Sequence, residues 1–226
     1  METVLVQSLR AEAAAARGDH YACFLWDLSN FYEFISAELL WERAKTRGFP
    51  LCILAISLNQ YKGKRFLGLD QLAVECGYPL CGIAAGCGFA TVYVQVYSMD
   101  PLEAWARRNP TLSLSVFIDD LTSDNTSATE HQVTGRLAAG AADLKLTVEQ
   151  ELGCHIADHK SAIIASGRSL LERCRKAFGR FAGATGSAAS NLGVDVFAGK
   201  RRTRKHSTPT LQKRRRQLLR RVRRLQ

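Results

Sequence analysis

The sequence has no CxxC pair, and no apolar run in it approaches the roughly 18 residues that span a bilayer. Residues 1–12 lack the basic start and long apolar core of a signal peptide. The seven cysteines are an odd number scattered through apolar stretches, which fits neither a disulfide framework nor a zinc ribbon. We therefore expect an intracellular protein, in the nucleus or cytoplasm, without a membrane partner.

Acidic residues are absent from residues 200–226, which hold 13 of the 31 lysines and arginines. Residues 1–199 carry 18 basic and 21 acidic side chains, a net charge of −3. A basic segment of this density is typical of a polyanion-binding surface, most often for nucleic acid, although nuclear-import signals and solvated helix ends share the composition. The candidate nucleic-acid-binding residues are Lys200, Arg201, Arg202, Arg204, Lys205, Lys213, Arg214, Arg215 and Arg216.

The hydrophobic pattern predicts helices that alternate with a few strands. The expected helices are 2–17, 36–47, 51–59, 90–107, 128–152 and 168–181, and the expected strands are 20–26, 111–118, 161–166 and 191–197. The chain resumes after 118 to form a hairpin with an acidic pair at its tip, and 182–190 is rich in Gly, Ala and Ser, as loops are. This mixture indicates an α+β fold rather than a doubly wound parallel sheet.

Carboxylates stand at the ends of two predicted strands, Asp27 after the first and Asp119 with Asp120 after another. If these strands are neighbours in one sheet, the three carboxylates converge, which like charges tolerate only with protons or divalent cations between them. Carboxylate oxygens favour Mg²⁺ or Mn²⁺, and two such ions would stabilise the attacking and leaving oxygens of a phosphoryl transfer. The alternative is that Asp27 caps a turn and the acidic pair begins a loop.

The order of these segments resembles the palm domain of reverse transcriptases, particularly the group II intron, retron and non-LTR retroelement branches. WDLSNFYEFI at 26–35 is similar to motif A, GIAAGCGFA at 82–90 to motif B, FIDD at 117–120 to motif C, LGCHIADHKSAIIAS at 152–166 to motif D and NLGVDV at 191–196 to motif E. The resemblance implies a polymerase palm, with an antiparallel sheet and helices packed on one face. It divides the chain into an N-terminal helix left from the fingers at 1–18, the palm with partial fingers at 19–199, and a basic tail or start of a thumb helix at 200–226.

The resemblance also implies roles for the acidic and basic residues of these motifs. Asp27 and Asp119 would bind both metal ions, Mg²⁺ or Mn²⁺, and Asp120 would be an accessory carboxylate. Lys160 would lie near the pyrophosphate and could donate a proton to it, as part of the catalytic set. The alternative for Lys160 is an exposed loop lysine.

Four further residues would contact the incoming nucleotide if the resemblance holds. Tyr32, beside Phe31, would stack under the sugar and exclude a 2′-hydroxyl. The alternative for Tyr32 is an aromatic residue of the hydrophobic core. Ala85 and Gly86 stand in the loop of motif B, and Gly86 would let the backbone approach template and nucleotide, or simply start a helix. Motif B usually reads Pro-Gln-Gly, so Ala84 and Ala85 depart from the family pattern and the positioning glutamine is missing.

Both ends of the chain differ from a full polymerase of this family. Only 26 residues precede Asp27, and Arg10 and Arg17 are the basic residues available there to hold a triphosphate. At the other end, residues 211–225 place apolar side chains on one helical face among lysines and arginines, like the beginning of a thumb. We therefore expect partial fingers and an incomplete thumb, as in a retroelement fragment or a truncated gene.

Three functions are consistent with these observations. The first is RNA-directed DNA synthesis, in which a DNA primer 3′-hydroxyl on an RNA template attacks a deoxynucleoside triphosphate. The second is a catalytically inactive remnant of a retroelement that binds nucleic acid through its basic tail. The third is an RNA-templated RNA polymerase, against which the aromatic residue Tyr32 argues, because ribonucleotides need room at that position.

Overall fold

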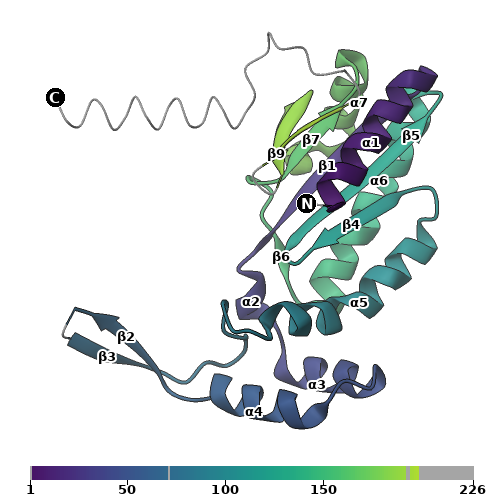
Figure 1. Ribbon diagram of the computed structural model, residues 1–226. Coiled ribbons are helices and arrows are strands. Elements are labelled where there is room, and N and C mark those ends of the chain that lie inside the picture. Colours follow the sequence, from purple (N-terminus) through teal and green to yellow (C-terminus); the bar gives the residue numbers. More distant parts are fainter. Residues whose placement is uncertain (1, 71, 192–193, 199–226) are drawn as a thin grey trace, which may run out of the picture. The chain divides into compact units, whose positions relative to one another are not determined.

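The computed structural model describes residues 2–70, 72–191 and 194–198 (Figure 1). The basic residues singled out at 200–216 lie outside this part of the chain. The described residues form two compact units, each built from segments that are distant in the sequence. The first unit combines the residues up to 27 with 109–143 and the chain from 157 onward, and the second combines 28–108 with 144–156.

A mixed sheet forms the centre of the first unit, with the strand order β4-β5-β1-β7-β8. Its strands are β1 (His20–Ser29), β4 (Ser113–Phe117), β5 (Asp120–Ser127), β7 (Ala162–Ala165) and β8 (Ala184–Gly186). β1 pairs antiparallel with both β5 and β7, and β8 is parallel to β7. The apolar run that predicted a buried strand at 20–26 is therefore the middle of the sheet.

Side chains of β1 alternate between the two faces of this sheet. Tyr21, Cys23 and Leu25 pack with Ala11 and Ala14 of α1 (Glu2–Arg17), in a core that also includes Ile164, Val196 and Ala198. The hairpin of β9 (Ala188–Asn191) and β10 (Val194–Phe197) belongs to this side through Val196. Fully buried alanines let α1 lie close to the strands (Figure 1).

The opposite face of the sheet packs against a second layer of helix. The ring of Phe24 lies 4.9 Å from that of Phe178, centroid to centroid, in α7 (Arg168–Phe178). α6 (Glu130–Leu146) joins this layer through Thr134, whose hydroxyl lies 3.9 Å from the Cys174 sulfur. The polymerase-palm sheet was expected to carry helices on one face, and α1 adds a helix on the other. A short 3-10 helix (Gly179–Ala182) follows α7.

The second unit is mainly helical. It contains α2 (Phe31–Phe34), α3 (Ala37–Thr46), α4 (Leu51–Tyr61), a hairpin of β2 (Arg65–Leu69) with β3 (Leu72–Gly77), and α5 (Ala90–Arg108). A π-helical turn (Thr147–Glu151) and β6 (His155–Ile156) complete it, with β6 paired to Leu28 and Ser29. Tyr93, Tyr97 and Trp105 of α5 are fully buried and form its core. Among the residues described, no helix combines the length and hydropathy needed to cross a bilayer.

Several predicted boundaries needed correction. The first strand continues to Ser29, so Asp27 lies within β1 and not after it. The helix expected over 128–152 ends as α-helix at Leu146 and continues as the π-helical turn. The loop expected over 182–190 contains β8 and part of β9, and the strand expected over 191–197 is split between β9 and β10. The helix over 2–17 is confirmed.

Candidate active site

The carboxylates of motifs A and C meet at one end of the sheet in the first unit. In the β1–β5 register Asp27 is directly opposite Asp120, next to the pair Trp26 and Leu121. β4 and β5 form a hairpin in which Phe117 pairs with Asp120, so Ile118 and Asp119 make the two-residue turn. The sequence predicted that the carboxylates converge if the two strands are neighbours, and β1 and β5 are paired neighbours.

The turn that carries Asp119 contains an unusual backbone conformation. Ile118 has φ 59°, in the left-handed region that β-branched residues rarely adopt. A two-residue hairpin turn needs positive φ at its first position, where glycine or asparagine is usual. The strand pairing on both sides holds Ile118 there, and strain held in this way often occurs at functional sites. The conformation fixes the direction in which the chain delivers Asp119 and Asp120.

Electrostatic repulsion is built into this end of the sheet. Burial, followed by the charges of Asp119 and Asp27, raises the pKa of Asp120 to about 6. The only cation among the described residues that pairs with these carboxylates is Lys160, whose Nζ lies 3.5 Å from Oδ1 of Asp27. An added positive charge here would relieve the repulsion.

Backbone contacts tie Lys160 to the end of β1. The Ala157 N–H donates to the carbonyl of Asp27 at 2.8 Å, and the Lys160 N–H donates to the carbonyl of Ala157 at 2.9 Å. The Asp27 N–H in turn approaches the hydroxyl of Ser161 at 3.4 Å. The segment resembling motif D is therefore held against the strand of motif A, and Lys160 belongs to the same site as Asp27.

The donor chemistry of this site suits a hard divalent cation. Its three carboxylates offer oxygen ligands and an unbalanced negative charge, which Mg²⁺ and Mn²⁺ prefer. Within the described ranges, however, no three His, Cys, Asp or Glu side chains are grouped as a metal-binding cluster. The carboxylates fit the expected ions by chemistry and charge, but their side chains do not form a closed ligand set.

The residues predicted to contact the nucleotide lie in the second unit. Phe31 is buried and Tyr32 is half-buried, with their rings edge to face and the centroids 6.3 Å apart. The loop of Ala85 and Gly86 is attached to α2, because the Ile83 N–H donates to the carbonyl of Tyr32 at 2.9 Å. The structure therefore brings these four residues into one unit, and the four predicted catalytic residues into the other.

Gly82 is a position that the sequence reading missed. Its φ is +94°, its N–H donates to the carbonyl of Ile35 at 2.9 Å, and an added Cβ would lie 2.9 Å from the Cα of Glu33. Gly86, which was singled out instead, also has positive φ (+88°) but faces open space. The density of small residues over 82–90 is the only sequence signal, and it does not distinguish the two glycines.

Comparison with known proteins bears on the fold. No protein-family model matches the sequence, and no curated protein matches it. Among solved structures, telomerase from Candida tropicalis in complex with a TWJ fragment of telomeric RNA has a TM-score of 0.53 at 10% sequence identity, covering 88% of this chain and 33% of that one. This similarity, with the strand order described above, shows a reverse-transcriptase-like fold and confirms the expected α+β polymerase palm.

Two further telomerase structures are similar at a lower score. The apo enzyme from Candida tropicalis, truncated from its C-terminal domain, has a TM-score of 0.49 at 10% identity, covering 88% of this chain and 38% of that one. The Candida albicans enzyme in complex with a TWJ fragment of telomeric RNA has a TM-score of 0.49 at 12% identity, covering 91% and 34%. The chain thus spans about a third of the length of the structures it matches.

Proposed function

We propose that this chain is the reverse-transcriptase domain of a retroelement, an RNA-directed DNA polymerase that adds deoxynucleotides to a primer 3′-hydroxyl on an RNA template. The observation that carries the proposal is the register of β1 and β5, which sets Asp27 opposite Asp120 with Asp119 in the adjoining turn. A nucleotidyl transferase of this kind needs carboxylates at one point of a rigid sheet, where cations can be held beside the reacting phosphate.

The first-unit residues would divide the work of the reaction. Asp27 and Asp119 would hold two Mg²⁺ or Mn²⁺ ions, with Asp120 as an accessory carboxylate. Bound there, the ions would neutralise charge that develops on the attacking and leaving oxygens. Lys160, whose ammonium already lies beside Asp27, would donate a proton to the departing pyrophosphate. The raised pKa of Asp120 supports this arrangement, because a carboxylate crowded by like charges gains most from a bound cation.

The second unit would bind the nucleotide. Tyr32 would stack under the sugar and exclude a 2′-hydroxyl, beside Phe31, and the backbone at Ala85 and Gly86 would approach the base pair. RNA template and DNA primer would be the macromolecular partners, held partly by the cations of 200–216 through phosphate contacts. The proposal that the chain belongs to a retroelement of the group II intron, retron or non-LTR type rests on the order of the motifs. An intracellular location is proposed because the RNA template and the DNA primer are found inside cells.

The proposal is tested by primer extension on an RNA template with deoxynucleoside triphosphates and Mg²⁺ or Mn²⁺. The wild-type chain is compared with an Asp119→Asn, Asp120→Asn variant, which keeps the shape of both side chains, and with Glu12→Gln on the exposed side of α1 as a matched control. Synthesis by the wild type and Glu12→Gln alone supports the proposal. Synthesis that persists in the double variant would overturn it.

Two additional measurements separate the alternatives. If no variant extends the primer but the folded wild type binds template in a salt-sensitive way, the chain is the inactive binding remnant. Tyr32→Ala should admit ribonucleotides if the aromatic ring excludes the 2′-hydroxyl. Equal use of ribonucleotides by the wild type would instead indicate an RNA-templated RNA polymerase.

A further inference from the structure

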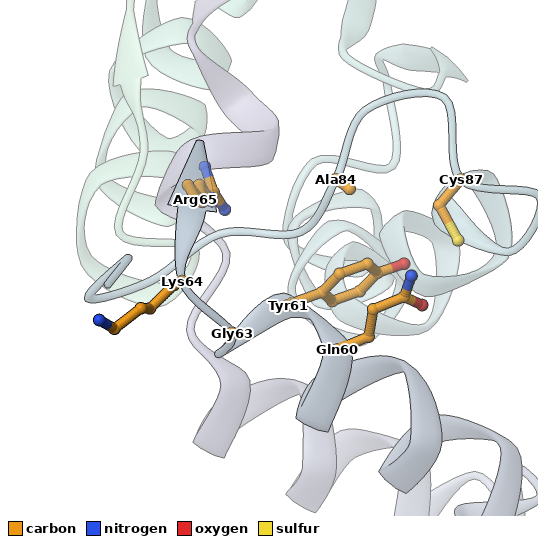
Figure 2. A pocket seen from close by; sticks show the side chains of 7 residues that line it. All are labelled: Gln60, Tyr61, Gly63, Lys64, Arg65, Ala84 and Cys87. Carbon is orange, nitrogen blue, oxygen red and sulfur yellow. The ribbon is translucent and has the colours of Figure 1, made fainter. Parts of the chain in front are cut away.

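A pocket of about 400 Å³ in the second unit is separate from the carboxylates. It is lined by Gln60, Tyr61, Gly63, Lys64, Arg65, Ala84 and Cys87, from the end of α4, the start of β2 and the loop before α5 (Figure 2). The lining contains two cations, a phenol, an amide and a thiol, and no carboxylate. These side chains favour an anionic ligand that either reacts with a thiol or accepts a hydrogen bond from one.

Cys87 occupies the turn that leads into the 19-residue helix α5. Its N–H donates to the carbonyl of Ala84 at 3.1 Å, and its own carbonyl accepts from the Ala90 N–H at 3.0 Å. The free N–H groups at a helix start favour negative charge, so this position stabilises a thiolate. The side chain is partly exposed and faces the pocket (Figure 2).

Tyr61 supplies a second feature of the pocket. Its side chain is only 7% exposed, and its hydroxyl has no hydrogen-bond partner of ordinary geometry among the described residues. The hydroxyl points toward Cys87 across the pocket (Figure 2). A buried phenol without a partner is costly, and a thiolate or a ligand atom in the pocket would accept its hydrogen bond.

These neighbours act on the thiol in the same direction. The Tyr61 hydroxyl and then the Phe89 N–H lower the pKa of Cys87, burial opposes them with a smaller effect than either, and the Ala90 N–H lowers it least. Burial raises the pKa of Tyr61, so this phenol stays protonated and remains a donor. Cys87 therefore carries more thiolate at neutral pH than an ordinary cysteine.

The other six cysteines provide internal references. Cys23, Cys154 and Cys174 are buried, and burial raises the pKa of each, that of Cys154 to about 12. Cys52, Cys76 and Cys81 are more exposed than Cys87, but none of them lines this pocket. If exposure alone decided reactivity, these three would react before Cys87.

We propose that Cys87 is a modification site whose thiolate reacts with a small anionic disulfide that enters the pocket. The thiolate attacks one sulfur of the disulfide, a new S–S bond forms as the old one breaks, and the released thiolate takes up a proton equivalent to the one that Cys87 lost. Arg65 makes no ion pair among the described residues, whereas the Lys64 ammonium lies 2.8 Å from Glu75. Arg65 is thus the cation available to a carboxylate of the ligand.

The test exposes the full-length chain briefly to glutathione disulfide, a tripeptide disulfide with four carboxylates, and quantifies the mixed disulfide at each cysteine by peptide mass spectrometry. Cys87 should be modified at least about fivefold faster than Cys52, Cys76 or Cys81. Tyr61→Phe, which removes only the hydroxyl, should slow Cys87 several-fold and leave Cys52 unchanged. Equal rates at the four cysteines, or a Cys87 rate unaffected by Tyr61→Phe, would overturn the proposal.

A second pair of probes tests the charge preference. Iodoacetate and iodoacetamide alkylate thiolates in the same way but differ in charge, so the ratio of their rates reports the electrostatics of each thiol. The rate with iodoacetate divided by the rate with iodoacetamide should be higher at Cys87 than at Cys52. At Cys87 this ratio should fall in Arg65→Ala. A ratio that Arg65→Ala leaves unchanged would contradict binding of an anion in the pocket, and circular dichroism confirms that each variant is folded.

Discussion

The carboxylate cluster makes a prediction about stability that needs no enzymatic activity. Replacing Asp120 by asparagine preserves the shape of the side chain and removes a charge that burial, Asp119 and Asp27 disfavour. The pKa of Asp120 is raised from its usual 3.8 to about 6. At about 1.4 kcal/mol per pKa unit, the full effect would be about 3 kcal/mol. Because the side chain is only half-buried, solvent screening reduces it to about 1–2 kcal/mol.

The size of the effect depends on pH. Well below pH 3.8 the Asp120 carboxyl is protonated in both the folded and the unfolded chain, so it costs nothing. Well above pH 6 it is ionised in both states and the folded state bears the whole cost. The free energy of unfolding of Asp120→Asn should therefore match that of the wild type near pH 3 and exceed it by about 1–2 kcal/mol at pH 7.5.

Urea unfolding in EDTA, followed by the fluorescence of the buried Trp26 and Trp105, measures this difference across the pH range. Glu12→Gln, which removes an exposed carboxylate from α1, should show no comparable pH dependence. Mg²⁺ should narrow the gap if the carboxylates bind the ion, since the wild type then gains more stability than the variant, which keeps Asp27 and Asp119 but lacks one carboxylate. The reasoning is refuted if the stability gained by Asp120→Asn over the wild type is no larger at pH 7.5 than at pH 3.

Two other contacts make predictions of their own. Gly82→Ala should lower the free energy of unfolding by about 2–4 kcal/mol, because the added Cβ would collide with the backbone of Glu33. Gly86→Ala, at a glycine with similar φ that faces open space, should cost about 1 kcal/mol. Equal losses of the two variants in urea unfolding would contradict the collision. Arg10→Ala should destabilise the protein by about 2–3 kcal/mol at pH 8, because it removes the guanidinium that lies 3.1 Å from the 3%-exposed carboxylate of Asp124. Burial raises the pKa of Asp124 to about 6, so at pH 5 this carboxyl is mostly protonated and the loss should be smaller. Adding Asp124→Asn should recover most of that loss, and a double-mutant cycle in urea checks whether it does.

The sequence predicted best where a long apolar run left few choices. The run from His20 to Trp26 is strand-forming and apolar, and it became the central strand of the sheet. The convergence of Asp27 with Asp120 could only be stated as conditional, because a strand's neighbours depend on contacts between segments that no local pattern records. The resemblance to a polymerase palm implied that the two strands are neighbours, and the observed register pairs Asp27 with Asp120.

Other elements could not be predicted for identifiable reasons. The β2–β3 hairpin places apolar residues such as Phe66 in solvent, 62% exposed, so it lacks the alternation of buried and polar positions that marks a strand. Apart from Thr185, β8 and β9 consist of small residues with weak strand propensity. They form strands by pairing with β7 and β10, and these pairings are not recorded in the local sequence. The need for glycine at Gly82 arises from the carbonyls of α2, which the sequence does not place beside it.

The central position of β1 also determines when the sheet can be completed. The Trp26 indole N–H donates to the Ser123 hydroxyl across 97 residues of chain, and the Tyr21 N–H donates to the Ser166 hydroxyl across 145. At ribosomal rates the second of these separations corresponds to on the order of ten seconds of synthesis. During that interval β1, whose residues from Tyr21 to Trp26 are buried in the folded protein, has emerged without all of its partners, so slow refolding, a need for chaperones and aggregation on rapid expression are expected costs of this topology.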